Sequence, residues 1–147
     1  MIDRSQIGVV SEPRFIEVEK GQLRFFAKAT GETNPIYFDE QAARRAGYPS
    51  LPAPPTYAFT LYLGAPATRG GLADLGIDVR RVLHGEQSFT HHRMIYAGDL
   101  ITIVTRTQDI YQRKAGALEF VVQDTTLANQ HGEVCVEMRT VIVVRNQ

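Results

Sequence analysis

The sequence predicts an α+β domain in which an antiparallel sheet wraps around one central helix. In the first third of the chain, apolar residues recur at three- and four-residue spacing, which is typical of helices. A strongly apolar segment, residues 56–64, follows a loop rich in proline. From about residue 79 onward, apolar and polar residues alternate every second position, so the remainder is expected to form strands.

Two short helices are expected before the proline-rich loop. In the first, residues 18–31, one face carries Leu23, Phe26, Ala27 and Thr30, and Gly31 ends the helix. The second, residues 39–47, reads DEQAARRAG. Asp39 is placed to cap its start and Gly47 to terminate it.

The third expected helix is the central one. Its sequence, TYAFTLYLG, is apolar on nearly every side, with Pro55 and Thr56 at the start and Gly64 at the end. A helix that is apolar all round is normally buried. We therefore expect the sheet to wrap around it.

Four or five strands are expected. Four of them are residues 86–94, 100–112, 117–127 and 133–145. They are separated by YAGD, RKAG and ANQHG, which are turn sequences. Connections this short predict antiparallel neighbours. In the last segment Val134, Val136, Met138, Thr140, Ile142 and Val144 share one face, opposite Cys135, Glu137 and Arg139. Open sheet edges predict pairing into a dimer.

Composition limits the class of protein. The 147 residues are expected to form one domain, residues 1–147, and 16 basic and 16 acidic residues give no charge footprint for nucleic acid or anionic membranes. The only cysteine, Cys135, has no partner spacing for a disulfide or zinc site. No signal peptide or membrane-spanning run is evident. A cytoplasmic protein without a metal or cofactor is expected.

The loop between the two small helices, GETNPIYFDE, gathers three polar side chains: Glu32, Asn34 and Tyr37. Pro35 stiffens the loop and prevents Asn34 from continuing a helix. These side chains have an ordinary structural interpretation, in which Glu32 is solvated, Asn34 bonds the turn and Tyr37 packs its ring. A stiff polar loop also fits an active site.

Two blocks of sequence resemble the MaoC-like hydratases and dehydratases. ATGETNPIYFDEQAARRAGYPSLPAPPTYAF is similar to the family signature, and HGEQSFTHHRMIYAGD is similar to a later segment of the amino-terminal-type domains. The resemblance implies a hot-dog fold and the hydration of 2-enoyl thioesters, or the reverse reaction, in fatty acid metabolism. The substrate would be carried on coenzyme A or acyl carrier protein.

Position by position, the resemblance places the family's catalytic aspartate at Glu32 and its catalytic histidine at Tyr37. It also implies substrate binding by Asn34 and by the start of the central helix, Pro55 and Thr56, where a backbone N–H would hold the thioester oxygen. A tyrosine has a pKa of about 10 against about 6.5 for histidine, so Tyr37 is a weak base at neutral pH. Lowering that pKa by roughly three units requires about 4 kcal/mol of differential stabilisation.

The remaining histidines and several arginines are weaker candidates. A histidine without an oriented carboxylate is seldom a catalyst, so a structural role is expected for His84, His91, His92 and His131. Coenzyme A phosphates could be held by Arg44, Arg45, Arg80, Arg81 or Arg93, although solvated surface positions are an equal alternative for them.

Three functions remain open. The first is the non-catalytic, substrate-binding partner of a catalytic MaoC-type subunit. The second is an active homo-oligomeric enoyl-CoA hydratase that uses Glu32 with Tyr37, His91 or His92. The third is an acyl-CoA-binding module without turnover. A hot-dog thioesterase is disfavoured because residues 56–64 offer no carboxylate.

Overall fold

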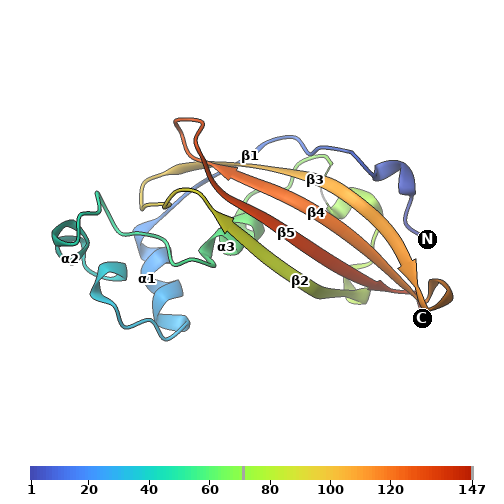
Figure 1. Ribbon diagram of the computed structural model, residues 1–147, viewed down its shortest axis with the longest axis horizontal. Helices are drawn as coiled ribbons and strands as arrows, with labels where there is room; N and C mark the ends of the chain where they lie inside the picture. Colours follow the sequence, from blue (N-terminus) through green and yellow to red (C-terminus); the bar gives the residue numbers. More distant parts are fainter. Residues whose placement is uncertain (71, 147) are drawn as a thin grey trace.

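The computed structural model describes residues 1–70 and 72–146, and it shows one curved antiparallel sheet that partly encloses a helix (Figure 1). The sheet contains β1 (Arg14–Glu17), β2 (Val82–His91), β3 (Leu100–Arg113), β4 (Leu118–Ala128) and β5 (Val134–Arg145). The helices are α1 (Lys20–Ala29), α2 (Glu40–Arg45) and α3 (Tyr57–Gly64). The expected fold class, a hot-dog arrangement, is confirmed. Within the described residues, no helix is long and apolar enough to cross a membrane.

The two small helices form where the sequence predicts them and lie together beyond one end of the sheet (Figure 1). Asp39 caps α2, its Oδ1 accepting from the N–H groups of Gln41 at 2.7 Å and Ala42 at 3.1 Å. Gly31 follows α1 with a φ of +74°, a left-handed conformation that glycine adopts without strain. The connecting loop is thereby fixed at both ends.

Helix α3 is only half covered, so the expectation of a fully buried central helix is wrong for this chain by itself. Tyr57, Ala58 and Leu61 are buried against the sheet. Thr60 and Leu63 lie on the opposite side, and Leu63 is 66% exposed. A single sheet curves around one side of the helix, which leaves the side that carries Thr60 and Leu63 open.

The strand order is β1-β3-β4-β5-β2, so β2 and β3 are not neighbours and the hairpin expected around YAGD is wrong. The segment between them, residues 92–99, crosses the end of the sheet instead. His92 N–H donates to Cys135 O at 2.8 Å, and Ala97 N–H donates to Leu51 O at 2.9 Å. Residues typical of turns therefore form a crossover here, held by hydrogen bonds to distant carbonyl groups, rather than a tight hairpin turn. The pairings of β3 with β4 and of β4 with β5 agree with the prediction.

Three register shifts interrupt the regular alternation, and one of them lies in β3 between Thr107 and Asp109. The register of β4 against β5 shifts between Leu127 and Ala128, opposite Cys135. Cys135 and Val136 are consequently both buried, whereas Val134 is exposed, so the predicted faces are wrong at this end of β5. On the open edge strand β2 the shift lies at Gly85. A Cβ there would come within 2.9 Å of Val143 Cγ2, which explains the glycine.

The core consists of two apolar clusters, one around α3 and a smaller one at the far end of the sheet. Beside the smaller cluster, Glu119 is 1% exposed. Its carboxylate accepts from Ile2 N–H at 2.9 Å, Asn146 Nδ2 at 2.8 Å and Gln112 Nε2 at 3.3 Å. These three hydrogen bonds lower the pKa of Glu119, although burial, the largest single influence, acts in the opposite direction.

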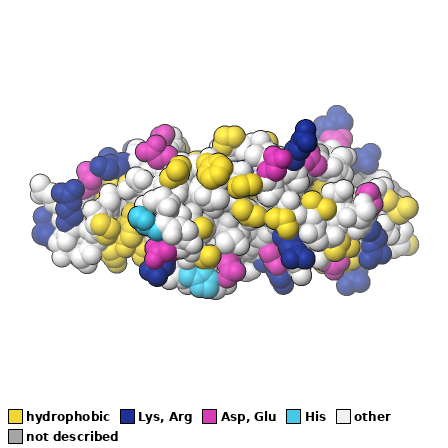
Figure 2. All heavy atoms as spheres, turned by 90° about the horizontal axis from the view of Figure 1, so that it is seen from above, with side chains coloured by type: hydrophobic (Ala, Val, Ile, Leu, Met, Phe, Trp, Pro, Cys, Tyr) yellow, Lys and Arg dark blue, Asp and Glu magenta, His cyan; other side chains and the backbone are white. Residues whose placement is uncertain are grey.

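The surface carries both signs of charge. On the face seen in Figure 2, basic and acidic side chains are interspersed and apolar side chains gather between them. This distribution agrees with a formal net charge of zero. A ligand with phosphate groups would therefore depend on a few local side chains.

Candidate functional site

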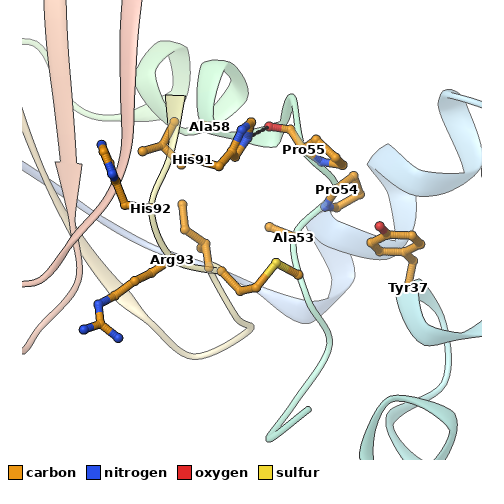
Figure 3. A pocket seen from close by; sticks show the side chains of 11 residues that line it. Tyr37, Ala53, Pro54, Pro55, Ala58, His91, His92 and Arg93 are labelled. Atoms are coloured by element: carbon orange, nitrogen blue, oxygen red, sulfur yellow. Dashed lines mark hydrogen bonds between the residues drawn. The ribbon is translucent and has the colours of Figure 1, made fainter. Parts of the chain in front are cut away.

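A cavity of about 330 Å³ lies between the proline-rich loop, the start of α3 and the end of β2 (Figure 3). Its walls are mainly apolar, with polar groups from Tyr37 on one side and from the end of β2 on the other. The lining residues with the most direct bearing on function are Tyr37, Ala53, Pro55, His91, His92 and Arg93. An apolar cavity with a few polar groups at its edge is typical of a small-molecule site.

The signature loop forms one wall of the cavity, but two of its polar side chains are bonded within the loop. Glu32 Oε1 accepts from the N–H groups of Thr33 at 3.0 Å and Asn34 at 3.4 Å. Asn34 Oδ1 accepts from Ile36 N–H at 3.2 Å and so caps the short 3₁₀ helix Pro35–Tyr37. Neither Glu32 nor Asn34 lines the cavity. Both hold the loop in shape and thereby direct Tyr37 inward.

Tyr37 lines the cavity with a side chain that is partly buried. Burial raises the pKa of the Tyr37 phenol, and the negative charge of Glu32 and the nearby Tyr48 raise it further. The environment thus opposes the shift that a catalytic phenolate would need. At neutral pH the Tyr37 hydroxyl is a hydrogen-bond donor rather than a base.

The opposite wall is formed by His91, the last residue of β2, and by His92 and Arg93 at the start of the crossover segment, and each of these three side chains has a partner. His91 Nε2 lies 2.8 Å from Pro55 O, as Figure 3 shows. Because a carbonyl oxygen only accepts, His91 Nε2 carries the proton. His92 Nε2 lies 2.7 Å from Glu137 Oε2, and Arg93 Nη2 lies 3.1 Å from Glu133 Oε1. The His92 and Arg93 side chains are half exposed at the cavity rim.

The start of α3 lies between the two walls. Pro55 lines the cavity, and Thr56 is exposed at the N-cap position without a side-chain capping bond. Tyr57 N–H already donates to Pro54 O at 2.9 Å. Ala58, one residue further along, is buried and lines the cavity. The first turn of the helix therefore faces the cavity, as a site for a thioester oxygen requires.

Several other sequence candidates lie elsewhere. His84 packs against Phe59, with ring centroids 4.9 Å apart, and Arg80 pairs with Asp78 at 2.8 Å. Arg44 and Arg45 lie in the last turn of α2. His131 lines a second, more polar groove of about 750 Å³, which shares the His92 and Arg93 side chains with the cavity. Of the candidate arginines, Arg93 is the one that borders the cavity.

Sequence reasoning missed the apolar part of the cavity wall, for example Ala53, Met94, Ile95 and Val136. Small and apolar residues give no chemical signal by themselves. The alternation along residues 133–145 did place Val136 on one face with Met138. No local pattern indicated that Val136 and Ala53 would line the same cavity.

Comparison with known proteins gives consistent matches. The model of the FAS1-like dehydratase domain region matches residues 5–138. A UPF0336 protein of Saccharopolyspora erythraea is 35% identical over 145 residues, which cover 98% of this chain and 92% of that protein.

Among solved structures, the HadBC (3R-hydroxyacyl-ACP dehydratase) complex of Mycobacterium tuberculosis matches with a TM-score of 0.75 and 26% identity, over 93% of this chain and 96% of that one. A MaoC-like dehydratase gives a TM-score of 0.82 at 25% identity, over 96% of this chain and 42% of that one.

Proposed function

Because the chain belongs to the MaoC-like hot-dog family, we propose that it is the non-catalytic, substrate-binding subunit of an acyl-thioester hydratase or dehydratase. Its partner would be a catalytic MaoC-type subunit. The substrate would be a 2-enoyl or 3-hydroxyacyl thioester of coenzyme A or acyl carrier protein, and the complex would act in the cytoplasm.

Tyr37 is the observation that carries this proposal. Hydration of an enoyl thioester needs a base that activates water near C3 and a donor for C2. Tyr37 occupies the position of the family's histidine, and its pKa is raised rather than lowered. Glu32 is held by backbone N–H groups of its own loop. The chain keeps the shape of the active-site loop without a competent base.

The open surface of α3 supports a partner subunit. Thr60 and Leu63 are exposed, and the neighbouring strand β2 is an edge strand with unpaired backbone groups. An exposed leucine side chain beside an open edge strand favours association with another sheet. A similar solved structure, HadBC, is a complex of different subunits. The partner would cover this face and supply the missing histidine and aspartate.

The chain's own contribution would be binding and orientation of the thioester. The apolar walls of the cavity suit an acyl chain, and burial of that chain provides the main driving force. The Tyr37 hydroxyl can donate to a carbonyl oxygen, and Arg93 can attract phosphate at the rim. These groups select the substrate and exclude water without taking part in proton transfer.

The direct test measures hydration of crotonyl-CoA and longer enoyl-CoA substrates by the purified chain, alone and after addition of a catalytic MaoC-type subunit. We expect no turnover by the chain alone and turnover by the pair. Turnover by the chain alone would contradict the proposal. Tight acyl-CoA binding in calorimetry without turnover in either condition would favour a binding module instead.

A second candidate, an active hydratase, is favoured by one observation. The Pro55 carbonyl orients His91, so that His91 Nδ1 is left as the ring's acceptor beside the cavity. If His91 is the base, His91→Asn should abolish turnover by the homo-oligomer, and Glu32→Gln should reduce it strongly. Retention of full activity in either variant would exclude the corresponding role.

A further inference from the structure

A row of polar side chains crosses the inner face of the sheet beyond the cavity. Cross-strand pairing places Thr107, Gln123, Thr140 and Gln87 side by side on β3, β4, β5 and β2. This polar row lies between the two apolar clusters of the core, where apolar side chains would be the ordinary choice. Four adjacent strands thus carry polar side chains at directly paired positions.

Within this polar row the Gln123 amide nitrogen lacks a hydrogen-bond partner among the described residues. Gln123 is 1% exposed. Among the described residues, its Nε2 is the only buried side-chain nitrogen or oxygen that has no hydrogen-bond partner. Its Oε1 lies 3.5 Å from Tyr62 Oη, and Thr140 Oγ1 already donates to Gln87 Oε1 at 2.9 Å. Exchanging the amide nitrogen and oxygen would leave the oxygen without a partner, so one end is unsatisfied either way. Buried polar groups are normally hydrogen-bonded.

We propose that this polar row is a buried binding site for a neutral oxygen atom, to which Gln123 donates through Nε2. The row itself offers amides and hydroxyls but no charged group, so a neutral acceptor fits better than an anion. Such an oxygen can belong to an internal water molecule or to a hydroxyl or carbonyl group on an acyl chain. In the second case the inference rests on the proposed acyl-thioester function.

The cavity and the polar row share one strand face. Val136 lines the cavity, and Thr140 is four residues further along β5 on the same face, a separation of about 13 Å at about 3.3 Å per residue. Met138 faces inward between them. A methionine side chain changes rotamer readily, so Met138 can give way to a chain that extends from the cavity.

The test compares the full chain with Gln123→Met, which keeps the side-chain length and removes the amide. Gln22→Met, at an exposed position of α1, is the matched control. Crystal structures without ligand would show whether an oxygen atom lies within hydrogen-bond distance of Nε2. Calorimetry would compare a plain acyl-CoA with a mid-chain hydroxylated acyl-CoA of equal length, and urea unfolding would report stability.

An ordered oxygen at Nε2 without ligand, absent in Gln123→Met, with equal affinities for the two thioesters, supports the proposal with water as the occupant. A preference of about tenfold for the hydroxylated chain, lost in Gln123→Met but kept in Gln22→Met, supports it with an acyl oxygen as the occupant. No oxygen at Nε2 and no preference, together with greater stability of Gln123→Met, would overturn it. The crystal structures test the oxygen site even if the chain binds no acyl-CoA. Failure of the proposed function can therefore be distinguished from failure of this inference.

Discussion

At the end of the sheet that borders the cavity, His92 and Arg93 lie half exposed on the rim, and each is paired with one carboxylate. At the far end a single carboxylate, Glu119, is buried and shared among three donors. The first arrangement leaves charged groups within reach of a ligand. The buried arrangement around Glu119 leaves no room for a ligand, and it connects distant parts of the chain.

This difference indicates where the protein can be changed without unfolding. Exposed pairs contribute little to stability because water screens them and replaces lost partners. A buried acceptor shared by three donors cannot be replaced by water in the same way. Function and stability therefore depend on opposite ends of the same sheet, and variants can separate them.

The largest effect is expected from Glu119→Ala. Loss of the carboxylate leaves Ile2 N–H, Asn146 Nδ2 and Gln112 Nε2 without their acceptor, so the free energy of unfolding should fall by on the order of 3 kcal/mol. Urea unfolding measures this. Glu137→Ala, at the half-exposed partner of His92, is the control and should cost less than about 1 kcal/mol. Equal losses would remove the distinction between the two ends.

A smaller effect should follow from pH, since protonated Glu119 still fills its space. The folded-state pKa of Glu119 lies below its ordinary value, so its contribution is fully present above the unfolded-state pKa and is lost as pH falls through the folded-state pKa. Urea unfolding from neutral pH to about pH 3 should show a steeper loss of stability for the native chain than for Glu119→Gln. Parallel curves would show that Glu119 does not titrate with folding.

At the cavity end, Ala53→Phe should affect binding more than stability. Ala53 is half buried on the cavity wall, and its backbone N–H, bonded to Ile95 O at 2.8 Å, is unaffected by the substitution. A phenyl ring would occupy much of the cavity, so acyl-thioester affinity should fall at least about tenfold. Calorimetry checks this against Ala29→Phe on the exposed side of α1. Unchanged affinity would place the acyl chain elsewhere.

The smallest effects are expected at Tyr37. No side-chain hydrogen bond of Tyr37 occurs within the described residues, so Tyr37→Phe should unfold like the native chain. In the complex, kcat should stay within about twofold and KM should rise about threefold, because only the hydroxyl's hydrogen bond to the substrate carbonyl is lost. Tyr37→His should give the lone chain at most weak hydration activity, because Glu32 remains bonded to its loop. Steady-state rates on enoyl-CoA measure both. Full activity of Tyr37→His alone would show that the loop lacks only the imidazole.

The fold class, the two small helices and the strand region were predictable because each follows from a local period or a cap. Asp39 and Gly31 are examples, since their roles depend on residues within a few positions. The strand order was not predictable in the same way. Residues 92–99 contain turn sequences, yet distant carbonyls of Cys135 and Leu51 hold this segment in a crossover.

The short strand β1 was also missed, because its four residues are too few for a clear alternation. For the site, the sequence identified the loop and the unusual Tyr37. It did not reveal that Glu32 bonds its own backbone or that His91 meets Pro55 from β2, because both depend on tertiary geometry.

The bulge at Gly85 bears on which chains can assemble with this one. An edge strand with a regular ladder accepts almost any other strand, including those of misfolded chains, and so promotes aggregation. Strand β2 is irregular at Gly85, where neighbouring atoms of β5 leave no space for a side chain. A strand that pairs along the whole of β2 has to match this irregularity. The bulge therefore disfavours non-specific self-association and favours a partner whose strand has a matching shape.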